Sequence, residues 1–142
     1  MAGLKLLVVS TPMGPLGQGL GGGVELTLEA VLESLHRRGH ALSLVAAEGS
    51  QLPSTPLQNC WLEPGVPQPS WQHQQRSAPV QIPADGLLPR FWQRAMAEQQ
   101  PFDAVLNLGY DWLPLWLTPQ FQTPLCHLVS MGSVGEARDA VI

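Results

Sequence analysis

The start of the chain joins an apolar run to a glycine-rich loop and then to an amphipathic segment. The run from Leu4 to Ser10 is almost continuously apolar, which is typical of a strand buried on both faces of a parallel sheet. After the loop, apolar side chains recur at helical spacing between Val24 and Leu35, and Gly39 supplies the residue that ends a helix. A second apolar run, Ala41 to Ala46, follows at once. Strand, helix and strand in this order predict a βαβ unit with a right-handed crossover.

The rest of the chain continues this alternation around one long insertion. Residues 48–85 are rich in proline, glutamine and serine, which predicts an irregular segment with a short strand near Asn59 to Leu62. Residues 1–142 are therefore expected to form a single α/β domain, a Rossmann-like three-layer sandwich with a mainly parallel sheet. Residues 131–142 either form a short helix or mark a domain cut from a longer protein. Beyond the insertion we expect a helix capped by Asp85, a strand, a short helix and a strand, at Asp85 to Gln99, Ala104 to Leu108, Asp111 to Leu117 and Leu125 to Val129.

Composition argues against several classes of function. The formal net charge is -4, with 7 lysines and arginines among 142 residues and no long basic cluster, so nucleic acid is not an expected partner. No apolar run approaches the ~20 residues of a membrane span, although peripheral membrane association stays open. Cys60 and Cys126 lie far apart in apolar surroundings, which predicts buried free thiols in a cytoplasmic protein rather than a zinc site.

The glycine loop predicts a site for an anion or a sugar. Gly21, Gly22 and Gly23 stand where the helix begins, so its free N–H groups and positive dipole end face a ligand that no side chain blocks. A turn that merely eases helix packing is the alternative. Residues 17–22 also match G-x-G-x-x-G, but a long loop separates them from the strand, whereas a dinucleotide fingerprint begins directly after its strand. This spacing disfavours NAD binding.

Several segments in order resemble the amino-terminal domain of retaining GT-B glycosyltransferases of the glycosyltransferase 4 type. Members of that family open with a strand, a Gly-Gly loop and a helix ending in Arg-Gly-His, and Gly21 to Glu25 and Leu35 to Val45 are similar to this pattern. Pro101 to Asn107 is similar to the family's Pro-Phe-Asp strand, and Thr123 to Cys126 to its Thr-Pro strand. The resemblance covers most of the chain apart from about 48–85, and it implies the amino-terminal half of a GT-B fold.

The resemblance also implies an activity for the full-length protein. It would be a hexosyltransferase-like enzyme that moves a sugar from a nucleotide-sugar to an unknown acceptor, which could be a sugar, a lipid or a small molecule. This half would bind the acceptor and a missing carboxy-terminal domain most of the donor, so the chain alone is expected to be inactive. Gly21, Gly22 and Gly23 would face the donor phosphates and sugar. The family's histidine falls by position on Ser130, with His127 three residues earlier, and both are candidate catalytic residues. No metal or cofactor is expected.

Candidate acceptor contacts lie after a later strand. Tyr110 and Asp111 follow the strand from Ala104 at the edge where open α/β sheets place ligands, and Asp111 also suits the N-cap of the next helix. Two other functions stay open: a stand-alone nucleotide- or phosphate-binding module, and an NAD-dependent oxidoreductase fragment based on the G-x-G-x-x-G match. The insertion offers further aromatic and polar acceptor contacts, unless it is a disordered loop: Trp61, Trp71, His73 and Arg76.

Overall fold

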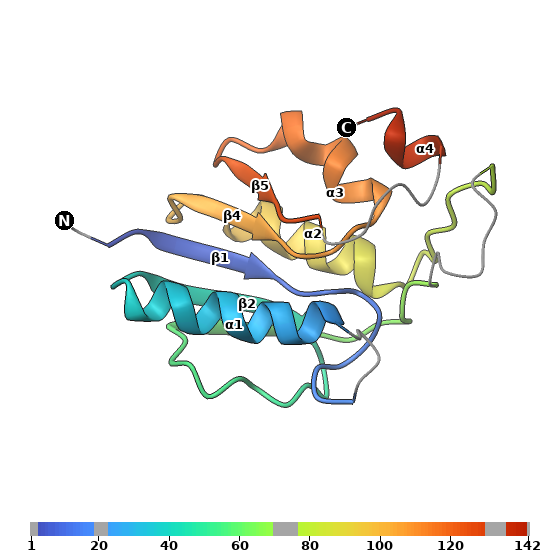
Figure 1. The fold of residues 1–142 in the computed structure, drawn as a ribbon. Coiled ribbons are helices and arrows are strands. Elements are labelled where there is room, and N and C mark those ends of the chain that lie inside the picture. The colour runs from blue at the N-terminus through green and yellow to red at the C-terminus, as the bar shows by residue number, and fades with distance from the viewer. Residues whose placement is uncertain (1–2, 19–22, 70–76, 130–135, 142) are drawn as a thin grey trace.

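The described residues fold around one sheet in which all five strands are parallel, in the order β3-β2-β1-β4-β5. Helices flank the sheet on both faces, as expected of a Rossmann-like α/β fold (Figure 1). The structure is a computed structural model that describes residues 3–18, 23–69, 77–129 and 136–141. The elements are β1 (Lys5–Val9), α1 (Gly23–Arg37), β2 (Ala41–Ala47), β3 (Asn59–Glu63), α2 (Leu87–Glu98), β4 (Ala104–Asn107), α3 (Trp112–Leu117), the 3-10 helix η2 (Thr118–Gln120), β5 (Leu125–His127) and α4 (Glu136–Asp139).

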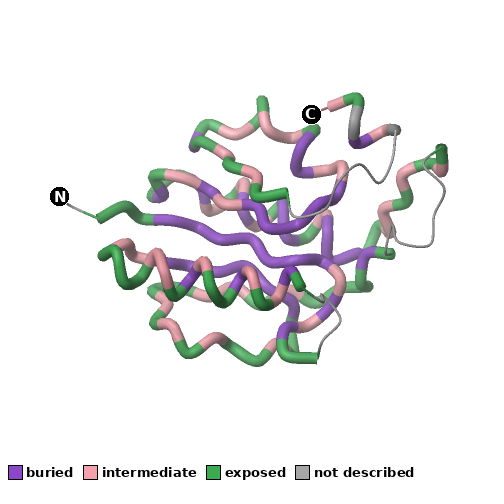
Figure 2. Tube along the Cα trace, viewed as in Figure 1, coloured by how far each residue is buried: buried purple, intermediate pink, exposed green. Residues whose placement is uncertain are grey.

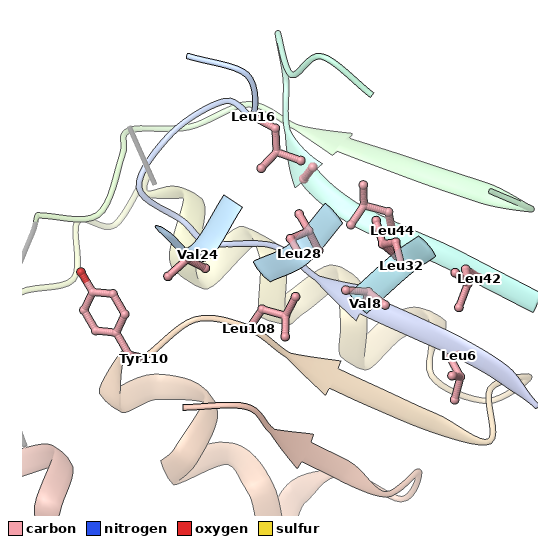
Figure 3. Close-up of a cluster of buried hydrophobic side chains, with 11 residues drawn as sticks. Leu6, Val8, Leu16, Val24, Leu28, Leu32, Leu42, Leu44, Leu108 and Tyr110 are labelled. Carbon is pink, nitrogen blue, oxygen red and sulfur yellow. The ribbon is translucent and has the colours of Figure 1, made fainter. Parts of the chain in front are cut away.

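The central strand β1 is buried on both faces, as its unbroken apolar run predicts. Successive side chains of a strand point to opposite faces, so Leu6 and Val8 pack against α1 whereas Leu7 and Val9 pack against α2. Figure 2 shows this buried strip through the middle of the sheet, and Figure 3 shows the α1 side of the core. The largest buried partners from the two helices are Leu28 and Leu32 of α1 and Phe91 and Trp92 of α2.

Two segments behind the family resemblance have structural roles. Gly39 has φ +89° and donates its N–H to the His36 carbonyl at 2.9 Å, so it ends α1 in the left-handed conformation that glycine tolerates best. Asp103 of the Pro-Phe-Asp segment accepts the Lys5 N–H through Oδ2 at 2.7 Å. Its own N–H donates to the Lys5 carbonyl at 2.7 Å. These bonds fix the start of β1 and the entry into β4.

The start of α2 differs from the prediction. Gly86, not Asp85, occupies the N-cap position, and no side chain caps the helix. The reason is a contact distant in sequence: the Asp85 carbonyl accepts the Val66 N–H at 3.0 Å, and Leu87 N–H donates to the Val66 carbonyl at 2.8 Å. Backbone pairing with the insertion therefore takes the place of the expected cap. The short strand expected near residue 59 is confirmed as β3.

The prediction of buried cysteine thiols is wrong for Cys126. Both cysteines are free, but Cys60 is half-buried and Cys126 is exposed. Burial raises the pKa of the Cys60 thiol. Cys126 lies on β5, a short strand at the edge of the sheet, and the apolar residues that follow it, Leu128 and Val129, are also exposed. An apolar run in an edge strand therefore has the same sequence pattern as a buried strand.

Candidate functional site

The carboxyl ends of β1 and β4 lie side by side at the centre of the sheet. β1 leads to α1 on one face, whereas β4 leads to α3, whose Leu113 and Leu117 pack with α2 on the other face. Such a divergence is a topological switch point, where open α/β sheets bind ligands. Residues 10–13 and 107–111 form this switch region. Its two loops meet at Gly109, where an added Cβ would lie 3.5 Å from Pro12 Cδ and 3.7 Å from Asp111 Oδ2.

A directed chain of hydrogen bonds connects β4, β5 and α3 at the switch region. Asn107 Oδ1 accepts the Gly109 N–H at 2.8 Å, which leaves the Asn107 amide nitrogen to donate to His127 Nδ1 at 2.9 Å. The Thr118 hydroxyl donates its single proton to the Pro114 carbonyl at 3.0 Å. Its oxygen therefore accepts from His127 Nε2 at 2.8 Å. The only tautomer that satisfies all four bonds is neutral, with the proton on Nε2.

His127 is thus fully hydrogen-bonded in its neutral form. Burial lowers the pKa of the imidazole, and protonation of Nδ1 would bring an N–H against the donating amide of Asn107. The Nδ1 lone pair already accepts the hydrogen bond from the Asn107 amide. The ring can therefore act as a general base only after that bond breaks. The arrangement favours a positioning role for His127 over direct proton transfer.

Asp111 supplies the carboxyl group of the switch region, and this group is deeply buried. It occupies the N-cap position of α3, as predicted, but its side chain makes no capping hydrogen bond. The residue is 3% exposed, and Oδ1 has no hydrogen-bond partner in the part of the chain that the structure describes. Desolvation raises the pKa of Asp111 to about 7, against the opposing charge of Arg138. Near neutral pH this carboxyl group can therefore either donate or accept a hydrogen bond.

Tyr110 connects the switch region to three other segments. Its ring joins the buried cluster of α1, which includes Val24 (Figure 3). Its hydroxyl donates to Met13 Sδ at 3.9 Å, and its carbonyl accepts from Nη1 of the buried Arg138 at 3.3 Å. The start of α1, the loop after β1 and α4 therefore all contact the loop after β4. Tyr110 is 6% exposed, so most of its ring serves packing.

One predicted donor-binding glycine lies within the described residues. Gly23 is the first residue of α1, and an added Cβ there would meet no atom of the described residues within 4 Å. Glu25 in the first turn accepts the Gly17 N–H through Oε1 at 2.8 Å, so its carboxylate is directed back to the loop. Gly21, Gly22 and Ser130 lie outside the described residues.

A second feature of the same sheet edge is a cavity of about 270 Å³ at the carboxyl ends of β2 and β3. Its walls come from the loop after β1, the two strand ends and the first residue of α2. Two of its lining side chains, Glu48 and Glu63, are carboxylates. The lining residues are Pro15, Ala47, Glu48, Gly49, Glu63, Pro64, Gly65, Pro67 and Leu87.

Sequence reasoning missed Asn107 and Thr118, and it misplaced Trp61. A polar residue at the end of an apolar strand was the available signal for Asn107, but no pattern marked Thr118. Trp61 belongs to β3 and meets the ring of Phe102 edge to face at 6.3 Å, so it packs in the core and not in an open loop. The other aromatic and polar candidates of the insertion lie outside the described residues: Trp71, His73 and Arg76.

No protein-family model matches the chain, and no curated protein matches it. Over the described ranges, no group of three or more histidine, cysteine, aspartate or glutamate side chains is arranged to hold a metal ion. No helix described in the structure is long and apolar enough to cross a bilayer. A functional proposal therefore rests on the sequence resemblance and on the geometry of the carboxyl edge of the sheet.

Proposed function

We propose that this chain is the amino-terminal, acceptor-side domain of a retaining GT-B glycosyltransferase that transfers a sugar from a nucleotide-sugar. The family resemblance supplies the chemistry. One structural observation carries the proposal: the first turn of α1 leaves its backbone accessible at Gly23, where an added Cβ would meet no atom of the described residues within 4 Å. Val24 and Tyr110 share one buried cluster, which holds the helix start and the loop after β4 together (Figure 3). A ligand at this point can contact both.

The start of α1 is suited to the donor. The helix has 15 residues, so its first turn presents N–H groups without partners inside the helix and the positive end of a substantial dipole. Glycine leaves the backbone accessible, and phosphate oxygens bind well at such positions. By position, Gly21, Gly22 and Gly23 would contact the donor phosphates and sugar. The carboxy-terminal domain would supply the rest of the donor site.

The loop after β4 is suited to the acceptor. The buried Asp111 carboxyl group has an oxygen unpartnered among the described residues, and an acceptor hydroxyl would supply its hydrogen bond once the loop opens. Tyr110 anchors the loop, and His127 orients it through Asn107 and Gly109. Ser130 stays a candidate for a hydroxyl contact with the donor sugar. The contribution of this half to catalysis would be orientation of the two substrates.

The proposal is tested with the full-length gene product and a panel of nucleotide-sugars with sugar, lipid and small-molecule acceptors. We expect a new glycosidic product whose anomeric configuration, followed by proton NMR, is that of the donor. Saturable nucleotide-sugar binding without any transfer or donor hydrolysis would instead identify a binding module. A product with inverted configuration would contradict the family assignment.

A further inference from the structure

The cavity at the ends of β2 and β3 has the size of a site for one small ring. Ligand pockets for drug-sized molecules usually measure about 300–1,000 Å³, and this one measures about 270 Å³. It lies at the carboxyl edge of the sheet, where α/β folds bind ligands, but beside the switch region and not within it. It therefore offers a binding site that the predicted site residues do not use.

The walls of the cavity are held in place by backbone hydrogen bonds and by one bond to a side-chain hydroxyl. Glu48 N–H donates to the Glu63 carbonyl at 2.8 Å, which joins the two strand ends. Ser50 Oγ accepts the Leu16 N–H at 2.8 Å, and Gln51 N–H donates to the Leu16 carbonyl at 2.9 Å. The loop after β1 is thereby fixed to the loop after β2. A site held in this way loses little entropy on binding a rigid ligand.

The far wall is equally constrained. Gly65 lies against the start of α2, where an added Cβ would be 3.0 Å from both the Asp85 carbonyl oxygen and the Leu87 nitrogen. The pairing of Val66 with residues 85–87 holds this approach. Three prolines complete the walls and present C–H surfaces without backbone donors: Pro15, Pro64 and Pro67.

The charged side chains that line the cavity are both acidic. Glu63 is fixed by Arg94, whose Nε donates to Glu63 Oε1 at 2.6 Å, and Arg94 itself is not part of the lining. Glu48 is exposed and makes no ion pair with any residue that the structure describes. Carboxylates accept charge-assisted hydrogen bonds from hydroxyl groups and repel anions. The lining thus combines flat C–H surfaces with acceptors, which complements a neutral ring that carries hydroxyl groups.

We propose that this cavity binds one neutral, hydroxyl-bearing ring of the acceptor and disfavours phosphorylated or carboxylated rings. That the ring belongs to the acceptor rests on the proposed function. That the cavity binds such a ring does not. Glu48 is the side chain that sets this preference, because it lines the cavity and is not neutralised by a partner in the described structure. Glu63, paired with Arg94, serves mainly as a fixed wall.

The test is an NMR titration of the ¹⁵N-labelled protein with neutral methyl hexosides and with hexose 6-phosphates. We expect at least one neutral hexoside to shift the amide resonances of Glu48, Gly49 and Gly65, and to bind at least tenfold more tightly than its phosphate. Glu48→Gln should weaken that binding by roughly tenfold or more, because one charged acceptor is lost. Glu48→Lys should invert the preference toward the phosphate. The matched control is Glu33→Lys on the exposed face of α1, which should leave binding unchanged.

The outcomes separate this inference from the proposed function. If no neutral hexoside binds, or if Glu48→Lys and Glu33→Lys behave alike, the cavity is not the predicted site, even if the full-length protein transfers sugar. If hexosides bind as expected but the full-length protein shows no transfer, the cavity assignment stands and the glycosyltransferase proposal fails. Unshifted resonances at Gly65 with binding elsewhere would also overturn the inference.

Discussion

The carboxyl edge of the sheet carries two regions built in different ways. At the switch region, buried and half-buried polar side chains hold the loops, as in the directed bonds from Asn107 through His127 to Thr118. At the cavity beside it, backbone hydrogen bonds and prolines hold the walls, and the lining carboxylate without an ion pair among the described residues, Glu48, lies at the surface. The first geometry depends on protonation states, because each bond needs a particular donor and acceptor. The second depends on backbone conformation. The two regions should therefore respond to different perturbations.

The largest effect is expected from Asn107→Leu, which keeps the branched shape and heavy-atom count of the side chain but removes both hydrogen bonds of the amide. The Gly109 N–H and His127 Nδ1 then lose their partners in a buried setting. Each such group costs about 1–3 kcal/mol, so the free energy of unfolding should fall by about 2–5 kcal/mol in urea denaturation. Gln100→Leu, at an exposed amide bonded to Gln122, is the matched control and should change stability by about 0.5 kcal/mol or less. Equal effects would show that the switch region does not depend on its polar chain.

The second prediction concerns Asp111 and pH. Its carboxyl ionises near 3.8 in the unfolded chain but only near 7 in the fold, so the folded state holds the proton over the interval between. The contribution of this group to the free energy of unfolding therefore falls as the pH rises from about 4 to 7, and it is constant above pH 7. Asp111→Asn should remove that fall and make the protein more stable at pH 8 by about 2–4 kcal/mol, with little difference at pH 4.

The check is urea denaturation of both proteins at several pH values, with Asp85→Asn at an exposed carboxylate as the control. A control that showed the same pH dependence would remove Asp111 as its source. Destabilisation of Asp111→Asn at every pH would mean that the ionised carboxylate is held by its surroundings, chiefly the charge of Arg138, and not disfavoured by burial.

The third prediction applies to the cavity. Gly65→Ala places a methyl group 3.0 Å from two backbone atoms of the α2 start, which must move apart. Overpacking of this kind costs about 1–3 kcal/mol, and it should also weaken hexoside binding because the wall is displaced. Gly23→Ala, where the methyl group meets no described atom within 4 Å, is the steric control and should not destabilise the fold. Thermal unfolding with the same NMR titration measures both effects. A stable Gly65→Ala protein with unchanged binding would show that the wall is adaptable.

The predictable parts of this fold are those that local patterns determine. The burial of β1 on both faces follows from its apolar run. The end of α1 follows from Gly39, because only a residue in the left-handed conformation fits there. The strand order needed the three-dimensional arrangement, as did the exposure of Cys126, since an apolar run looks the same at the centre and at the edge of a sheet. The N-cap of α2 was mispredicted because Val66 pairs with that turn from a distant part of the chain.

The candidate site was predictable to a similar extent. The position of Asp111 at the start of α3 followed from the sequence, but its burial did not, because that depends on packing around the loop after β4, including Arg138 of α4. The partner of His127 could not be read from the sequence either, since Asn107 lies on a different strand. The cavity is lined by three loops and α2, so no single sequence motif predicts it.

In the proposed sugar-transfer reaction, the start of α1 contacts the donor. The most direct test measures kcat/KM for the nucleotide-sugar in the full-length protein with Gly23→Val, against Ala30→Val on the exposed face of the same helix. The valine at residue 23 has free space among the described residues, so both variants should remain folded. We predict a loss of about a hundredfold or more for Gly23→Val, because a displaced donor reacts poorly, and near-normal turnover for Ala30→Val. Equal kinetics for the two folded variants would contradict the claim.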